Sequence, residues 1–346
     1  MNNLKRLFVC FSLLSIIYSN CLGDLNEDYA VDIHDIIIII NVIIYEDQNS
    51  NVHANLNSDS DINILDIIYI LNIILHQNQN CNPPIEISYN IHESLPEEWI
   101  EEFYIIMGNL ENIVPAYQNH FTELNIYAWN SNTEDPYIGI QGGTYIGGSS
   151  NGLNMVLEIN EMEFQWNHMH RYSVIAHEYF HVYQLSINEP MNEPNGGFNP
   201  NTFSIKWLIE GSATVFESMY IQEYYNYNYF SNELIYANIN NEVHMNPHIF
   251  ESYNSNNIDI NYTSSVFMVL VLAKELIESG YSEEHSFRMI FKDFMLTGAE
   301  NSDWEIYFEE TFELSVSQFY NILQSYPLNI SNVLPSESLY LNEIFN

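Results

Sequence analysis

Apolar residues recur at intervals of three and four along most of the chain, and this spacing predicts helices near both of its ends. Two Ile-rich helices are expected before residue 77, and the same spacing predicts helices at 97–113, 172–185, 207–217, from 262 and from 282. Shorter alternating runs bounded by Gly predict strands at 85–91, 124–129, 137–146 and 154–159. This order indicates an α+β chain, in which a small all-α segment precedes a mixed sheet and a mainly helical C-terminal half.

One of the predicted helices contains the sequence His177-Glu178-Tyr179-Phe180-His181. Side chains four residues apart lie on the same face of a helix, so the two histidines can bind one metal ion. Glu178 can then reach a metal-bound water without being a ligand, as in zinc peptidases, where the metal lowers the pKa of the water and the glutamate takes its proton. A surface helix that carries two histidines is the alternative. A catalytic zinc also needs a third protein ligand.

The sequence after this helix resembles a known peptidase family. His177-Glu178-x-x-His181 followed by Trp207-Leu208-x-Glu210-Gly211-x-Ala213 is similar to the gluzincins, especially their aminopeptidase-N-like and collagenase-like branches. The resemblance implies a zincin-type domain with one catalytic zinc ion, held by His177, His181 and Glu210. It also implies that the last strand of the sheet forms one wall of a cleft, where a peptide would pair with the strand edge. An ordinary solvated carboxylate is the alternative for Glu210.

Two further features of the 207–217 stretch concern the metal site. Small residues at 211–213 are expected to let this helix approach the metal-binding helix closely. Glu217 lies two turns beyond Glu210, near the same face, and could orient a ligating histidine. A surface glutamate is the alternative for Glu217.

The segment that begins at Tyr262 resembles the one that supplies the transition-state tyrosine in aminopeptidase-like gluzincins. The resemblance implies that the Tyr262 phenol donates a hydrogen bond to the oxyanion of the tetrahedral intermediate. Tyr253 is a rival for this role, and a packing residue is the alternative. Aminopeptidases of the family also carry a Gly-x-Met-Glu-Asn motif, which residues 152–158 do not match, so we expect an endopeptidase. Glu158 or Glu161 could still hold a substrate amine in another register.

An internal repeat precedes the peptidase-like region. Oxygen-bearing side chains fall at positions 1, 3, 5, 9 and 12 of two twelve-residue segments, and this is the spacing of loops that bind Ca²⁺. With Asp at position 12 and one helix after each loop, the pair resembles a dockerin module. The resemblance implies up to two structural calcium ions, with these ligands: Asp24, Asn26, Asp28, Asp32 and Asp35 in the first loop, and Asn55, Asn57, Asp59, Asn63 and Asp66 in the second.

The two loops depart from the usual pattern. Position 6, which normally carries Gly, is Tyr29 in the first loop and Ser60 in the second. Asn55 also removes one charge from the second loop, so we expect weakened calcium binding in both loops, and more so in the second. An Asp/Asn-rich linker that binds nothing is the alternative. If calcium does bind, the module either docks to a cohesin-like partner or only stabilises the exported protein.

The N-terminus predicts export. A basic start and a short apolar run over residues 1–22 are typical of a signal peptide, which is too short to span a membrane comfortably. After cleavage, Cys21 could carry a lipid or form a disulfide with Cys81, because the two cysteines flank the repeats. We therefore expect a secreted or cell-surface protein with four parts: a signal peptide at 1–22, the calcium module at 23–76, a Pro-containing linker at 77–84 and the peptidase-like domain at 85–346.

The net charge of −39 limits the partners of the chain. Such a charge repels nucleic acids and anionic membranes, and it favours cationic substrates or partners. The sequence thus predicts a secreted zinc-dependent metallopeptidase that hydrolyses peptides or proteins. The alternative is a calcium-dependent docking protein whose peptidase-like domain is not catalytic.

Overall fold

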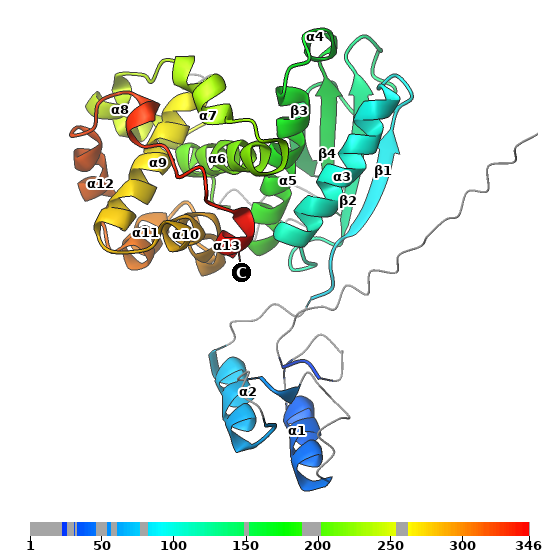
Figure 1. Cartoon of the computed structure of the whole chain (residues 1–346), viewed down its shortest axis with the longest axis vertical. Coiled ribbons are helices and arrows are strands. Elements are labelled where there is room, and N and C mark those ends of the chain that lie inside the picture. Colours follow the sequence, from blue (N-terminus) through cyan, green and yellow to red (C-terminus); the bar gives the residue numbers. More distant parts are fainter. Residues whose placement is uncertain are drawn as a thin grey trace, which may run out of the picture. The chain divides into compact units, whose positions relative to one another are not determined.

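The computed structural model describes residues 23–25, 31, 33–45, 54–56, 61–76, 82–148, 152–188, 202–253 and 262–345. The chain divides into two compact units, Met1–Pro83 and Pro84–Asn346 (Figure 1). Several residues singled out above lie outside the described ones: the signal peptide, both candidate disulfide cysteines, Tyr29, Ser60, and the calcium ligands Asn26, Asp28, Asp32, Asn57 and Asp59. In the described ranges, no helix combines the length and the apolar character needed to cross a membrane.

The first unit repeats one structural element. Helices α1 (Ile33–Tyr45) and α2 (Ile64–His76) each begin at position 10 of their loop. Ile39 and Ile70, which occupy equivalent positions, are both fully buried in the small core of this unit. Apolar packing between the two helices therefore follows the same register as the sequence repeat.

Position 12 of each loop also has the same structural role. Asp35 and Asp66 are fully buried, and each accepts a hydrogen bond from the backbone N–H at position 2 of its own loop, over 2.7 Å from Leu25 and 2.8 Å from Leu56. Asp66 accepts a second bond, from the Asn63 N–H, over 2.8 Å. Each carboxylate thus joins the start of its loop to the first turn of its helix, where the helix dipole also favours a negative charge.

The second unit contains a four-stranded sheet among its described residues. Its strands are β1 (Glu86–Ile91), β2 (Glu123–Asn130), β3 (Thr144–Gly148) and β4 (Gly152–Ile159). The strand order is β1-β2-β4-β3, with β1, β2 and β4 parallel and β3 antiparallel to β4. The mixed sheet predicted from the sequence is therefore present. However, β4 is an inner strand and β3 lies at the edge, so the expectation that the last strand lines a cleft with a free edge is wrong.

The strand predicted at 137–146 is also wrong over most of its length. Residues 137–143 form a loop, in which Gly139 and Gly143 adopt φ angles of +84° and +125° that interrupt an extended backbone. The alternating pattern there has another cause, because Tyr137 packs edge-on against Tyr127 and Trp129 and donates a hydrogen bond to the Asn90 carbonyl.

Long helices accompany the sheet and build the rest of the second unit. In Figure 1, α3 (Glu97–Ile113) lies across the sheet, α5 (His170–Ile187) runs beside it, and α6 (Lys206–Tyr225) and α9 (Thr263–Glu278) belong to the helical half. Short helices complete the unit: α4 (Glu161–Gln165), α7 (Tyr229–Asn232), η2 (Leu234–Tyr236), α8 (Glu242–Met245), η3 (Pro247–Glu251), α10 (Glu283–Arg288), η4 (Met289–Asp293), η5 (Met295–Thr297), α11 (Trp304–Phe312), α12 (Val316–Leu323), η6 (Ile330–Asn332) and α13 (Leu341–Phe345).

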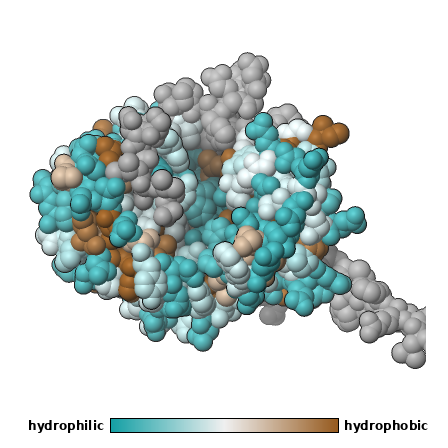
Figure 2. Space-filling view, turned by 90° about the horizontal axis from the view of Figure 1, so that it is seen from above, coloured by the Kyte–Doolittle hydropathy of each residue, from teal (hydrophilic) through white to brown (hydrophobic). Residues whose placement is uncertain are grey.

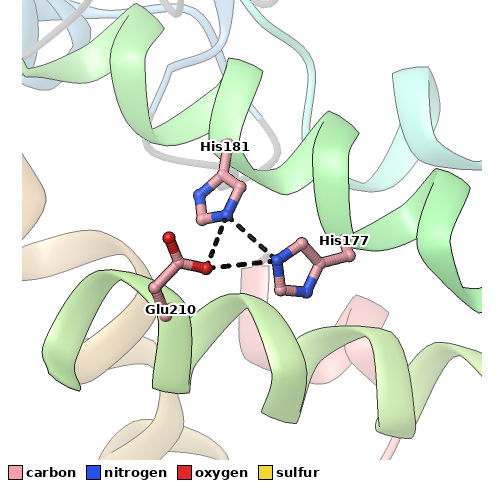
Figure 3. A group of neighbouring side chains, drawn as sticks. All are labelled: His177, His181 and Glu210. Atoms are coloured by element: carbon pink, nitrogen blue, oxygen red, sulfur yellow. Dashed lines mark hydrogen bonds and ion pairs between the residues drawn. The ribbon is translucent and has the colours of Figure 1, made fainter. Parts of the chain in front are cut away.

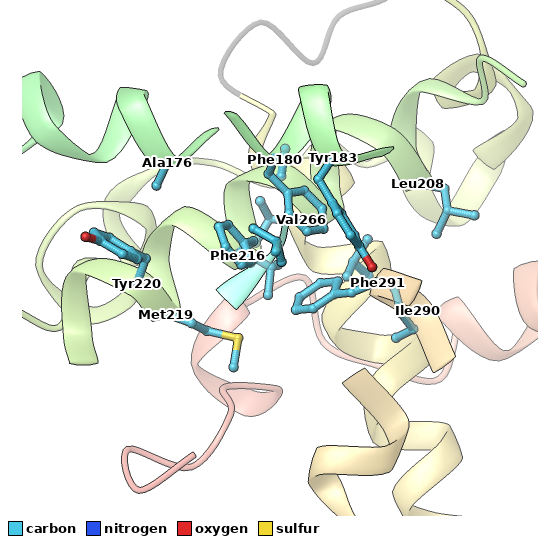
Figure 4. Packing of buried hydrophobic residues seen from close by; sticks show 14 of the residues in the cluster. Ala176, Phe180, Tyr183, Leu208, Phe216, Met219, Tyr220, Val266, Ile290 and Phe291 are labelled. Carbon is cyan, nitrogen blue, oxygen red and sulfur yellow. The ribbon is translucent and has the colours of Figure 1, made fainter. Parts of the chain in front are cut away.

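An aromatic core fixes α5 against α6. Phe180 and Phe216 are fully buried, and their rings stack with centroids 4.4 Å apart (Figure 4). Phe291 packs edge-on against Phe180, with 5.5 Å between the ring centroids. This packing holds the two helices that carry the candidate metal ligands in one register.

The close approach predicted for residues 211–213 occurs, but at Gly211 it involves a different helix. A Cβ atom at Gly211 would lie 2.6 Å from the backbone oxygen of Ser265 on α9. The absent side chain therefore allows contact between α6 and α9, and not between α6 and the metal-binding helix α5. Glu210, one residue earlier, points to the other side of α6, toward the histidines.

Candidate metal centre

Three side chains from α5 and α6 converge on one point. His177 and His181 lie one turn apart on α5, and Glu210 faces them from α6 (Figure 3). The Nε2 atoms of the two histidines are 3.1 Å apart, and each lies 3.3 Å from Oε2 of Glu210. Of the described residues, these three form the group able to hold a metal ion.

The spacing of the three donor atoms fits zinc. Ligands about 2.0–2.1 Å from a tetrahedral ion lie about 3.3–3.4 Å from one another. The observed separations of 3.1 and 3.3 Å nearly match this value. Two imidazoles and one carboxylate are also the type of donor set that zinc accepts, and three protein ligands leave one position open for a catalytic role.

The outer nitrogen of each histidine has its own partner. Nδ1 of His177 lies 3.4 Å from Oε2 of Glu217, and Nδ1 of His181 lies 2.8 Å from Oε1 of Gln184. Gln184 in turn donates a hydrogen bond to the Ile209 carbonyl on α6 over 3.4 Å. An acceptor at Nδ1 places the proton there and directs the Nε2 lone pair at the metal position. Glu217 thus lies where the sequence suggested, whereas no sequence motif marks Gln184.

Substitution of these partners should weaken zinc binding. We expect Glu217→Gln to lower zinc affinity about 10-fold to 100-fold, because the His177 ring loses the charged acceptor that orients it. Competition with a zinc-binding dye measures this change. Glu309→Gln, on an exposed position of α11, is the matched control and should leave zinc affinity unchanged. Equal affinities for both variants would exclude an orienting role for Glu217.

The carboxylates in and beside the triad favour the binding of a cation. Burial lowers the pKa of His177, but its contacts with Glu210 and Glu217 raise the pKa well above its ordinary value. Burial raises the pKa of Glu210, and the two histidines lower it far more, so this carboxylate stays ionised. The buried negative charges of Glu210 and Glu217 thus attract positive charge to this point, and a metal ion can supply it in place of protons.

Glu178 lies beside the triad and does not belong to it. The residue is 6% exposed and lines the same cavity as both histidines. Burial raises the pKa of its carboxyl, the two histidines lower it, and Glu210 and Glu217 raise it again, with a net increase. A carboxylate with a raised pKa is a better proton acceptor, which is what a general base requires.

Two tyrosines approach the triad in different ways. The Tyr253 hydroxyl donates a hydrogen bond to Oε1 of Glu210 over 2.9 Å. The Tyr262 ring stacks on His177, with 6.2 Å between the ring centroids and 14° between the planes, and its φ of +57° is strained for an aromatic residue. The amine of Lys206, itself buried, lies 4.8 Å above the Tyr262 ring. Both phenols line the cavity, so the structure keeps both residues as candidates for the oxyanion donor.

The site lies in the wall of a cavity of about 960 Å³. Figure 2 shows the hollow between the helical half and the sheet half, with mostly hydrophilic residues visible around it. The edge strand β3 contributes Thr144, Tyr145 and Ile146 to the lining, and Leu185, Phe203 and Met295 make one part of it apolar. Glu158 and Glu161, which could have held a substrate amine, are not among the lining residues.

The candidate calcium ligands are described only in part. Asp24, Asp35, Asn55, Asn63 and Asp66 belong to the described residues, and the other five ligands do not. Oδ1 of Asn63 accepts a hydrogen bond from the Leu65 N–H over 2.8 Å, at the start of α2. The calcium loops therefore stay a prediction.

Comparison of the chain with protein-family models, with curated proteins and with solved structures found no match.

Proposed function

We propose that the protein is an exported zinc-dependent metallopeptidase, which acts as an endopeptidase on peptides or proteins. The observation that carries the proposal is the convergence of His177, His181 and Glu210 at tetrahedral spacing in the wall of a large cavity. The resemblance of this region to the gluzincins supports the same function. Export rests on the N-terminal sequence.

Each residue at the site has a role in this proposal. Zinc, when bound, lowers the pKa of a water molecule and polarises the carbonyl group that is attacked. Glu178 takes the proton of the attacking water and later gives it to the leaving amine. A phenol, from Tyr253 or Tyr262, donates a hydrogen bond to the developing oxyanion. The outer edge of β3, the edge strand of the described sheet, holds the substrate backbone as an added strand.

Metal analysis tests the proposal. The purified mature protein should contain about one zinc per chain at the triad, and Glu210→Ala should lose it. A chelator should stop hydrolysis of a denatured protein substrate, and added zinc should restore it. If the wild-type protein holds no zinc, the proposed function is wrong. If Glu210→Ala keeps its zinc, the third ligand is another residue.

A second candidate function is calcium-dependent docking through the first unit. Exposed isoleucines occupy equivalent positions of the repeat: Ile33 and Ile64 are 59% and 61% exposed, and Ile37 and Ile68 are 47% and 49% exposed. Exposed apolar side chains at repeated positions on two helices are suited to binding a protein partner.

Capture experiments test the docking function. An immobilised cohesin-like domain should retain the full chain in calcium and release it in a chelator, and Glu178→Gln should not affect retention. The double variant Ile37→Glu, Ile68→Glu should reduce retention about tenfold or more, because each glutamate places a charge in an apolar contact. Retention that is indifferent to calcium or to these substitutions would rule out docking by this face.

A further inference from the structure

The cavity has an acidic end next to His177. Glu217 and Glu233 line it there, and Glu163 lies close by, with its Oε1 2.8 Å from Nδ1 of His170. Tyr229 lines the cavity as well, and all three carboxylates influence its phenol. Burial raises the pKa of its phenol, and the charges of Glu217, Glu233 and Glu163 raise it further. Three carboxylates therefore act on one part of the cavity.

The basic side chains that contact these carboxylates in the described residues are histidines. The described residues that line the cavity include no Lys or Arg, and the buried amine of Lys206 lies against the ring of Tyr262. Arg171 is near in sequence, but its guanidinium donates to the His168 carbonyl and to the Asn167 side chain. Burial lowers the pKa of His170, yet Glu163 raises it above its ordinary value. His170 contacts Glu163 and His168 contacts Glu233, so each of these carboxylates has only an imidazole, and no permanent cation, among its ion-pair contacts in the described residues.

Glu233 is the carboxylate best placed to meet a ligand. Its side chain is 28% exposed, whereas the Glu217 side chain is 7% exposed and is engaged with His177. The Tyr227 hydroxyl donates a hydrogen bond to Oε1 of Glu233 over 2.6 Å, and Nε2 of His168 lies 3.5 Å from Oε2. These contacts hold the carboxylate in place, and the Tyr227 phenol does so without neutralising it.

A buried hydroxyl at the same cavity points independently to a ligand. Thr214 lines the cavity and is 4% exposed, and its Oγ1 has no hydrogen-bond partner among the described residues. It lies on α6 one turn from both Glu210 and Glu217, on the face that carries them. A buried hydroxyl without a partner costs free energy, so a ligand that donates a hydrogen bond to it would gain that amount on binding.

We infer that the acidic end binds the cationic side chain of an arginine or lysine residue in the peptide substrate. Glu233 supplies the opposite charge, and Thr214 accepts a hydrogen bond from the cation or from the backbone that carries it. The apolar lining residues Leu185, Phe203 and Met295 take apolar side chains of the substrate. The inference rests on the proposed function for the identity of the ligand as a peptide.

Binding to a zinc-loaded Glu178→Gln protein tests the inference without turnover. Three probes are used in calorimetry with the full mature chain: an arginine peptide blocked at both ends, the same blocked peptide with citrulline in place of arginine, and the citrulline peptide with a free amino terminus. Citrulline keeps the shape and loses the charge. We expect the blocked arginine peptide to bind about tenfold more tightly than the blocked citrulline peptide.

Two substitutions assign the preference to this end of the cavity. Glu233→Gln, added to the same background, should abolish the preference for arginine, whereas the matched control Glu309→Gln on exposed α11 should retain it. Thr214→Val should weaken binding of the arginine peptide without lowering the unfolding temperature, because the hydroxyl that it removes has no partner in the described protein. A purely structural role for Thr214 would instead lower the unfolding temperature.

Other outcomes would overturn the inference. Equal affinity for arginine and citrulline would do so, as would a preference that survives Glu233→Gln or disappears equally in Glu309→Gln. Tighter binding of the free-amine citrulline peptide alone would assign the acidic end to the substrate's amino terminus. Failure of the proposed function would give a different result. If the Glu178→Gln protein prefers arginine but the wild-type protein hydrolyses nothing, the subsite exists and the protein is not a peptidase.

Discussion

Glu178→Gln should reduce peptide hydrolysis by about 10²-fold to 10⁴-fold, which is the usual contribution of a positioned general base. The glutamine keeps the size and the hydrogen-bonding capacity of the side chain but cannot take a proton at neutral pH. Glu178 points into the cavity beside the triad and provides none of the three converging donor atoms. Zinc content should therefore remain at the wild-type level while turnover is lost. Initial rates on a blocked peptide, with metal analysis of the same samples, measure both quantities.

Three outcomes would give different answers. Loss of activity with zinc retained assigns the proton transfer to Glu178, provided that Glu309→Gln keeps wild-type rates. Full activity in Glu178→Gln would contradict the proposed mechanism and would move the base to another carboxylate of the cavity. Loss of zinc together with activity would show that Glu178 supports the metal site, so the rate alone could not assign its role.

The features that the sequence predicted well depend on short-range spacing. His177 and His181 are four residues apart, and helix geometry alone brings them to one face. The helix expected at 97–113 has those bounds in the structure, because its apolar periodicity is uninterrupted and Pro96 precedes it. The repeated loops predicted two helices in equivalent positions for the same reason.

The features that the sequence did not predict depend on contacts between distant segments. Gln184 holds His181 only because α6 presents the Ile209 carbonyl behind it. Tyr253 is a rival for the oxyanion role, but its hydrogen bond to Glu210, across 43 positions of the chain, was not predicted. Strand β3 becomes the edge because β4 pairs with β2, a choice between strands that alternation along one strand cannot reveal. The acidic end of the cavity likewise joins residues of α6 with Glu233, beyond the end of α7.

Gly211 is the point at which a small backbone change should have a large effect. It follows Glu210 directly, and a Cβ there would lie 2.6 Å from the Ser265 oxygen and 2.8 Å from the Ser265 carbonyl carbon. Both neighbours are backbone atoms of a buried helix, so α6 and α9 would have to move apart. We expect Gly211→Ala to lower the free energy of unfolding by about 3 kcal/mol, although alanine is the better helix former.

The same substitution in another helix provides the control. Gly108 lies on an exposed position of α3, and a Cβ there would meet nothing within 4 Å. Gly108→Ala should therefore stabilise the protein by about 0.5–1 kcal/mol, the opposite sign to Gly211→Ala. Urea unfolding measures both changes.

Zinc affinity distinguishes a local effect at Gly211 from a general one. If α6 shifts away from α9, Glu210 moves relative to the two histidines. Zinc affinity should then fall in Gly211→Ala even under conditions in which the variant is fully folded. Gly108→Ala should keep its zinc affinity, because α3 contributes no ligand.

A stable Gly211→Ala protein with normal zinc binding would mean that α6 and α9 can separate without moving Glu210. A destabilised protein with normal zinc binding would confine the role of Gly211 to packing. Loss of both would show that contact with α9 sets the position of the third ligand.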